Sequence, residues 1–275
     1  MLTLNPLITP VREAAVAGKF YPGTRTGLEH AVKEMIGAGP TRRALGVMVP
    51  HGGYMYSGRV AGEVFGAVEL PQTFVIIGPN HTGLGPVASI MTSGVWRLPG
   101  GDAVIDGALA DSILARSRVL KADERAHAFE HSIEVQIPFL QYLVGDVGFV
   151  PISLMVTSAD YCRDIGQAVA AAIKAAPRPV LVVASSDMTH YESQAAAQEK
   201  DRLAIERLLA LDAEGLLETV QTNHISMCGA APAAAMLFAS RDQGAREARL
   251  IKYETSGDVT GDYQQVVGYA GVVVS

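Results

Sequence analysis

The chain has 275 residues, of which 49% are hydrophobic and 18% are charged, and its formal net charge at pH 7 is −6. This composition is typical of a globular protein and supplies enough apolar side chains for a substantial core. The acidic balance, and the lack of a Lys/Arg run interleaved with aromatic residues, argue against nucleic acid as a partner.

The N-terminal segment and the apolar runs indicate in which cellular compartment the protein lies. Residues 1–18 lack the basic start and apolar centre of a signal peptide, and no uninterrupted apolar stretch approaches a membrane span. We therefore expect a cytoplasmic protein without a membrane partner. In that compartment Cys162 and Cys228 stay reduced, which favours a metal-binding or reactive role over a disulfide.

Apolar segments with strand character alternate with segments of helical spacing along the whole chain. In chain order we predict a helix at 26–36, a strand at 44–50, a helix at 57–70 capped by Ser57, a strand at 73–78, a short strand and a helix within 101–116, an amphipathic helix at 130–145, a strand at 147–155, a helix at 158–176, a strand at 179–186, helices at 200–211, 212–222 and 230–241, and two final strands at 247–256 and 264–275. This alternation predicts an α/β fold with a central, mostly parallel or mixed sheet covered by helices on both faces. Because no linker, repeat or low-complexity segment interrupts it, we predict a single domain over residues 1–275.

Three of the predicted strands lead directly into polar residues. His51 follows ALGVMVP, His81 follows TFVIIGPN, and Asp187 and His190 follow VLVVASS. The carboxyl ends of strands in an open α/β sheet face one crevice, where ligands bind. Since histidine is the commonest side-chain metal ligand, the pattern predicts a metal centre or a histidine-based acid/base site.

Asp187 of this pocket has an alternative role, and so has one further candidate, Cys228. Asp187 can orient His190 or support a metal ligand, but it can also be the N-cap of a following helix. Cys228 lies at the start of a predicted helix, where free N–H groups and the helix dipole favour the thiolate. The alternative is a small buried apolar residue, which is our interpretation of Cys162.

The segment HAFEH, from His127 to His131, matches the H-x-x-E-H pattern of zinc proteases. A zinc hydrolase in which His127 and His131 hold the ion and Glu130 is the general base is therefore an alternative function. Against it, the predicted helix starts near Glu130 and leaves His127 in the preceding loop. In the simpler interpretation Glu130 and Glu134 cap and decorate the helix start, while His131 packs at the rim of the pocket.

Seven segments of the chain, in order and from about Ala17 to Gly271, resemble the Memo family, whose prokaryotic members are called AmmeMemoRadiSam system protein B. These segments are AGKFYPG, PHGGYMYSG, GPNHTG, EHSIEVQIPFL, SSDMTHY, SMCGAAP and YETSGDVTGDYQQVVGYAG. The family is in turn similar, in fold and pocket position, to class III extradiol dioxygenases, which hold Fe(II) with two histidines and a carboxylate.

The resemblance implies a role for each polar residue of the pocket. His51 and His81 match the two metal-binding histidines, and Cys228 falls where the dioxygenases have their carboxylate ligand. His190 matches the histidine that exchanges protons with substrate, with Asp187 beside it. The implied metal is Fe(II), but a thiolate with two imidazoles also suits Cu(I) or zinc.

Two functions follow from this resemblance. The first is a non-haem iron, dioxygenase-like oxidoreductase of unknown substrate, in which His190 is the acid/base, Asp187 orients it, and Tyr54 and His131 line the pocket for a small-molecule or peptide ligand. The second is a non-catalytic iron- or copper-binding or peptide-binding adaptor. The bacterial family name implies a radical SAM enzyme and an AMMECR-like protein as partners.

Overall fold

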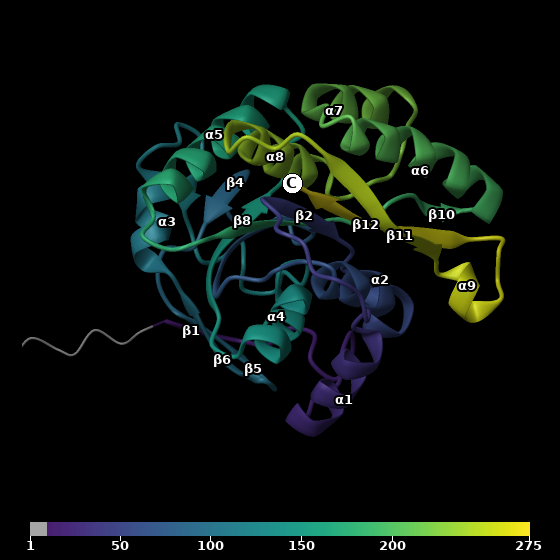
Figure 1. The fold of residues 1–275 in the computed structure, drawn as a ribbon, viewed down its shortest axis with the longest axis horizontal. Coiled ribbons are helices and arrows are strands. Elements are labelled where there is room, and N and C mark those ends of the chain that lie inside the picture. Colours follow the sequence, from purple (N-terminus) through teal and green to yellow (C-terminus); the bar gives the residue numbers. More distant parts are fainter. Residues whose placement is uncertain (1–9) are drawn as a thin grey trace, which may run out of the picture.

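A computed structural model describes residues 10–275 (Figure 1). Its elements are β1 (Val11–Glu13), α1 (Arg25–Met35), β2 (Gly46–Val49), α2 (Tyr54–Gly66), β3 (Thr73–Pro79), β4 (Ala88–Ile90), β5 (Val95–Leu98), β6 (Gly101–Ile105), α3 (Gly107–Leu114), β7 (Lys121–Ala122), the 3₁₀ turn η1 (Glu134–Gln136), α4 (Ile137–Val144), β8 (Gly148–Leu154), α5 (Ala159–Ala175), β9 (Leu181–Ser185), β10 (His190–Glu192), α6 (Gln194–Leu209), α7 (Ala213–Thr222), α8 (Ala230–Asp242), β11 (Ala248–Thr255), α9 (Gly257–Thr260) and β12 (Val266–Val274). Residues 1–9, half of the segment in which we expect no signal peptide, lie outside the described residues. Between residues 10 and 275, no helix has both the length and the apolar character that crossing a membrane requires.

The strands form one mixed sheet in the order β1-β5-β6-β8-β3-β9-β2-β12-β10, with β11 also paired to β12 and β4 linking β7 to β8. Its centre, from β6 through β8, β3 and β9 to β2, is parallel. The strand β12 closes one side by pairing antiparallel with β2, and β5 pairs antiparallel with β6 on the other. The predicted α/β fold with a mixed sheet is therefore confirmed.

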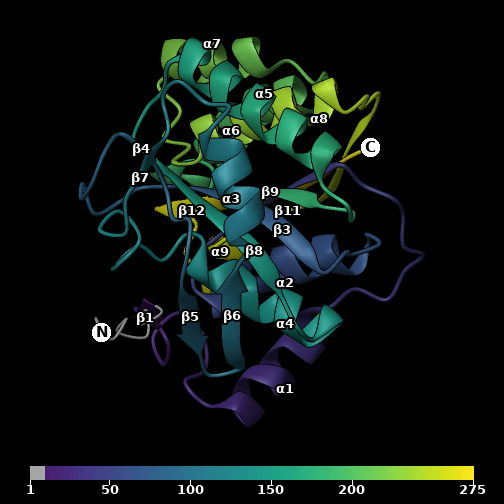
Figure 2. The same cartoon turned by 90° about the vertical axis from the view of Figure 1, so that its left-hand side faces the viewer.

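Helices cover both faces of this sheet, as Figures 1 and 2 show. Successive side chains of a strand point to opposite faces, so Val47 and Val49 of β2 join a core with α1, α2 and α4. Met48, between them, joins a second core with α3, α5, α6, α7 and α8. Burying an aliphatic side chain of this size stabilises the fold by about 1.5–3 kcal/mol, which explains why the central strands are mostly apolar.

Two helices next to the predicted pocket begin at other residues than the sequence pattern indicates. The helix α2 starts at Tyr54, three residues early, because the chain turns within Gly52 and Gly53. Ser57 lies inside its first turn and donates a hydrogen bond to the Gly52 carbonyl instead of capping the helix. The helix predicted at 130–145 starts only at η1, since the carboxylate of Glu130 binds the N–H groups that follow it.

Short strands account for most of the remaining differences. The sequence analysis did not predict β1, β4, β5, β7 or β10, each of two to four residues, because so few residues carry no periodicity. The helix α6 begins at Gln194, six residues before the predicted start, and Ser193 caps it by accepting the N–H of Ala196. Asp187 is therefore not a helix cap.

Candidate metal centre

Three neighbouring parallel strands, β3, β9 and β2, end at the same edge of the sheet. His51 follows β2 after Pro50, His81 follows β3 after Asn80, and Asp187 follows β9 after Ser186. The crevice expected at the carboxyl ends of these strands therefore brings the three residues together. The centroids of the His51 and His81 rings are 5.2 Å apart.

The ring of His51 is held from behind by a network of neutral groups. Ser185 Oγ donates to the Ser132 carbonyl at 2.6 Å and accepts Gln136 Nε2 at 2.9 Å. Because its one proton is used, Ser185 Oγ accepts from His51 Nδ1 at 2.9 Å. Gln136 Nε2 also donates to the Pro50 carbonyl, which fixes the amide orientation. The network thus assigns the proton of His51 to Nδ1 and leaves Nε2 free.

Asp187 fixes the backbone of the His51 loop. Its Oδ1 accepts the N–H of His51 at 2.7 Å and that of Gly52 at 3.2 Å. Burial raises the pKa of Asp187 in spite of these hydrogen bonds. The expectation that Asp187 orients the His190 ring is wrong, because the hydrogen bond of that ring joins its Nδ1 to the Ser226 carbonyl.

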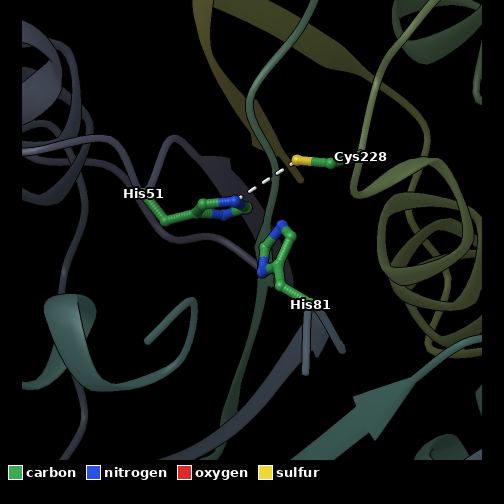
Figure 3. A group of neighbouring side chains, drawn as sticks. All are labelled: His51, His81 and Cys228. Carbon is green, nitrogen blue, oxygen red and sulfur yellow. Dashed lines mark hydrogen bonds between the residues drawn. The ribbon is translucent and has the colours of Figure 1, made fainter. Parts of the chain in front are cut away.

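Cys228 closes the site from the loop before α8. A side chain at the following residue, Gly229, would collide with the Ser185 carbonyl at 2.4 Å, so only glycine lets this loop approach β9. Cys228 Sγ lies 3.2 Å from His51 Nε2, and a longer contact of 3.7 Å joins it to the Asp187 carbonyl. With His51 Nε2 unprotonated, the thiol is the donor in the shorter contact (Figure 3).

The charge state of this pair differs from the sequence-based expectation. Burial and then the charge of Asp187 raise the pKa of the Cys228 thiol, whereas the start of a helix was expected to favour the thiolate. Burial, followed by the neighbouring His131 and His81, lowers the pKa of His51 well below its ordinary value. Without metal, the pair is therefore a neutral thiol and a neutral imidazole.

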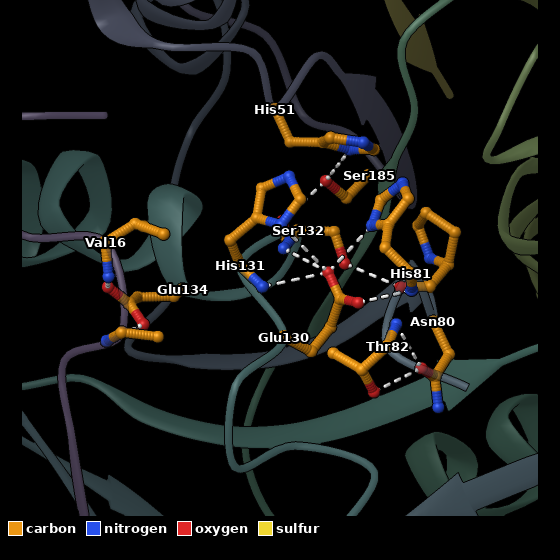
Figure 4. A network of polar contacts seen from close by, with 12 residues as sticks. Val16, His51, Asn80, His81, Thr82, Glu130, His131, Ser132, Glu134 and Ser185 are labelled. Atoms are coloured by element: carbon orange, nitrogen blue, oxygen red, sulfur yellow. Dashed lines mark hydrogen bonds and ion pairs between the residues drawn. The ribbon is translucent and has the colours of Figure 1, made fainter. Parts of the chain in front are cut away.

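The ring of His81 is held by a carboxylate. Glu130 Oε1 lies 2.9 Å from His81 Nδ1, and Oε2 accepts the backbone N–H of His81 (Figure 4). Because a carboxylate only accepts, the proton lies on Nδ1 here as well. The other ring nitrogen points into the space between His51 and Cys228 (Figure 3).

The charges of His81 and Glu130 support each other. Burial raises the pKa of Glu130, but the hydrogen bond and charge of His81, with backbone N–H groups, outweigh it and bring the pKa to about 2. Burial lowers the pKa of His81, but its hydrogen bond to Glu130 and that carboxylate's charge produce a net rise. The pair is therefore an ion pair wherever the His81 ring is protonated.

His131 lies where the rim of the pocket was predicted. Its ring stacks on His81 with centroids 4.8 Å apart and meets the edge of His51 at 5.5 Å. Phe20 covers its other side at 4.8 Å. The ring is half-buried, and burial lowers its pKa.

His190 is oriented by Ser226. Its Nδ1 lies 3.0 Å from the Ser226 carbonyl, and its backbone N–H donates to Ser226 Oγ. A carbonyl only accepts, so the neutral ring of His190 also carries its proton on Nδ1. The next residue, Tyr191, has a left-handed backbone with φ of 59° at an irregularity between β10 and β12. Such a conformation is uncommon outside glycine and is found at functional sites.

Tyr54 and His127 lie away from the cluster. Tyr54, expected at the mouth of the pocket, is 5% exposed, packs on Tyr21 and Phe139, and donates its hydroxyl to the Val135 carbonyl. His127 is fully buried against Trp96, and burial lowers its pKa to about 3. The segment from His127 to His131 is not helical, so the zinc-protease arrangement expected on one helix is absent from the described residues.

The ligand atoms of three residues are close enough for one metal ion. One nitrogen or sulfur atom each from His51, His81 and Cys228 lies within 4.8 Å of the others. One ion with bonds of about 2.0–2.3 Å spans such a group after small side-chain movements. A second group, His81 with Glu130 and His131, meets the same distance limit and shares His81 with the first.

The fold and this cluster define the chain as an α/β protein with a candidate metal centre at the carboxyl edge of its parallel strands. Comparison with known proteins identifies the family within this class. The model of a family described as Memo-like protein matches residues 12–273. The chain therefore belongs to the Memo family, as the sequence resemblance implies.

Similar proteins support this assignment over nearly the full length. A MEMO1 family protein of Methanopyrus kandleri is 43% identical, covering 95% of this chain and 98% of the relative. One of Methanothermobacter thermautotrophicus is 42% identical, covering 94% and 99%. A crystal structure of an uncharacterized protein from Escherichia coli K12 matches with a TM-score of 0.54 at 16% identity, covering 84% of this chain and 100% of that chain, which is a likeness of fold alone.

Proposed function

We propose that this Memo-family protein binds one transition-metal ion through His51, His81 and Cys228. The observation that carries the proposal is the group of three donor atoms within 4.8 Å of one another, in which Nδ1 of both imidazole rings is already engaged elsewhere. Two imidazoles and a thiolate suit Fe(II), Cu(I) and zinc, and we propose Fe(II) as the native ion.

The protein then acts as a dioxygenase-like oxidoreductase on a small molecule bound beside the metal. The ion supplies redox and Lewis-acid chemistry at the pocket. His190 exchanges protons with the substrate through Nε2, because its Nδ1 is committed to the Ser226 carbonyl. Asp187 holds the His51 loop in place through two backbone N–H groups.

A second function, a metal-binding protein without catalysis, is favoured by one observation. The third donor is the Cys228 thiol, 3.2 Å from His51 Nε2, where the dioxygenases that the family resembles have a carboxylate. A soft thiolate favours Cu(I) and zinc more than a carboxylate does. This function predicts tight metal binding without turnover of any aromatic diol.

Anaerobic reconstitution separates the two functions. Purified protein is titrated with Fe(II), Cu(I) and Zn(II) by calorimetry, and oxygen uptake is then measured with a panel of aromatic diols. For the oxidoreductase we expect one Fe(II) per chain and substrate-dependent oxygen uptake. Metal binding without uptake favours the second function, and failure to bind any of the three metals contradicts both.

His190→Ala tests the division of roles within the oxidoreductase. Loss of general acid/base help lowers turnover by roughly 10²–10⁴-fold, while the bound metal stays at one per chain. His51→Ala is the matched variant, because it removes a proposed ligand and should lose the metal. Metal loss in His190→Ala, with metal retained in His51→Ala, reverses the assignment.

A further inference from the structure

The carboxylate of Glu130 is the centre of a compact set of hydrogen bonds beside the candidate metal centre. Its Oε1 accepts from His81 Nδ1 at 2.9 Å, from the His131 N–H at 2.9 Å and from the Ser132 N–H at 2.8 Å. Its Oε2 accepts the backbone N–H of His81. Figure 4 shows Glu130 between the two histidines, with its contacts directed to both. Glu130 thus grips His81 at two points, one on the ring and one on the backbone.

This bonding distinguishes Glu130 from a metal ligand or a general base. Both oxygen atoms are occupied by donors from the protein, and the side chain is 1% exposed. A buried carboxylate keeps its charge only where such donors compensate it, so withdrawing it toward a metal or a water molecule would leave backbone N–H groups without partners. The hydrogen bonds therefore favour a role in positioning neighbouring residues over a role as metal ligand or general base.

We propose that Glu130 is a positioning residue, which fixes His81 as the tautomer protonated on Nδ1 and aims its Nε2 at the space between His51 and Cys228. The proposal rests on the proposed metal centre and gives the Glu of the H-x-x-E-H segment a function other than that of a protease base. A carboxylate behind a ligating histidine sets the tautomer, restrains the ring and increases the basicity of the ligand atom.

Glu130→Gln tests the role directly. An amide cannot accept all four hydrogen bonds, because its NH₂ group then faces an N–H donor. In anaerobic titrations with Zn(II) alone, we expect affinity to fall by about 10–100-fold, the usual cost of losing such a partner. In ¹⁵N spectra of metal-free protein, with His81 in its neutral form, we expect Nδ1–H in the parent and a shift toward Nε2–H in the variant.

Glu134→Gln is the matched control. Glu134 is an equally buried carboxylate four residues away, and it binds Arg12, Tyr21 and the N–H groups of Ala15 and Val16 but none of the ligand histidines. We expect a lower melting temperature for this variant, with the Zn(II) affinity and the His81 spectrum of the parent. A loss of stability alone therefore cannot imitate the predicted result for Glu130→Gln.

Three results would overturn the role of Glu130. They are a parent His81 ring protonated on Nε2, unchanged Zn(II) affinity and ring spectrum in Glu130→Gln, and a second Zn(II) per chain that this variant loses, which makes Glu130 a ligand. If Glu130→Gln does not fold, the parent spectrum still decides the tautomer. If the parent binds no Zn(II), Fe(II) or Cu(I), the proposed function fails, while the His81 spectrum still tests Glu130.

Discussion

The candidate metal centre has two halves, and each half holds one histidine ring in place with a different kind of chemical group. The inner half consists of His51, Cys228 and the neutral groups of Ser185 and Gln136 behind the ring. The outer half consists of His81, Glu130 and His131, where a carboxylate stands behind the ring. In both halves Nδ1 carries the proton, and Nε2 faces the other ligands.

The hydrogen-bond donors around each support explain why the two supports differ, because both supports are buried. His51 is 2% exposed, and the groups behind its ring are a hydroxyl and an amide, which hold the ring without a charge. The Glu130 carboxylate behind His81 is 1% exposed, but three backbone N–H groups donate to it, so an ionised group is tolerated there. The inner half is thus built for a neutral ring, and the outer half for one that changes its protonation.

Removing the Cys228 thiol should have the largest effect on metal affinity, because it takes away a proposed metal ligand of the inner half. Cys228→Ser replaces a soft ligand by a hydroxyl, so the loss of affinity for Cu(I) and Zn(II) should exceed the roughly 100-fold upper range for loss of a supporting partner. Cys228→Glu should keep Fe(II) but disfavour Cu(I). Calorimetry measures both, with Cys162→Ser, in the buried face of α5, as the silent control. Parent-like binding of Fe(II) and Cu(I) by Cys228→Ser contradicts a ligand role.

The pH dependence of metal affinity should separate the halves next. The raised pKa of the Cys228 thiol means that binding releases its proton, so affinity falls by about tenfold for each unit of decreasing pH. The raised pKa of His81 adds a second competing proton at lower pH, which steepens the slope. Titrations across neutral pH measure this, and Cys228→Ser should lose only the first component. A flat profile in the parent contradicts thiolate ligation.

Ser185→Ala should weaken the inner half by a smaller amount. It leaves the buried donors His51 Nδ1 and Gln136 Nε2 each without one partner, which costs roughly 1–3 kcal/mol of stability per unsatisfied group. Metal affinity should fall toward the lower end, about tenfold, of the range for a supporting group. Ser153→Ala, at a buried hydroxyl of β8 for which the described residues offer no hydrogen-bond partner, is the control and should lower neither quantity. Denaturant unfolding and calorimetry report the two effects, and equal results for both variants contradict the network.

Tyr54→Phe should have the smallest effect. It removes the hydroxyl that donates to the Val135 carbonyl behind the inner half, so stability should fall by about 1 kcal/mol. Metal affinity and turnover should match the parent, because the ring lies in the core. Loss of turnover with unchanged stability would return Tyr54 to the mouth of the pocket, where the sequence analysis put it.

The sequence was sufficient to predict which residues lie at the sheet edge. His51, His81 and Asp187 come together because uninterrupted apolar strands are recognisable and their carboxyl ends meet. The same pattern of a strand that leads into polar residues also indicated Ser185, which ends the strand before Asp187, but Ser185 was not predicted as a site residue. The predicted partner of Asp187 was wrong. Nearness in sequence pointed to His190, whereas the fold places the backbone of His51, 136 positions away, against Asp187.

Contacts between distant loops account for the other errors. The role of Glu130 depends on β3 delivering His81 to it, a contact across 49 positions that no periodicity encodes. Tyr54 lies before the helix predicted at 57–70, but α2 starts three residues earlier and turns the Tyr54 side chain into the core. For both Glu130 and Tyr54 the sequence identified the type of residue, but not the direction in which its side chain points.

The short contact from Cys228 to His51 has a consequence for the lifetime of the protein in air. The thiolate, and not the thiol, is the nucleophile that attacks peroxides and disulfides. In the metal-free protein the sulfur keeps its proton, because burial and Asp187 raise its pKa, and the proton is shared with a neutral imidazole. The free site is thereby shielded from sulfenic acid formation until a metal ion takes the place of the proton.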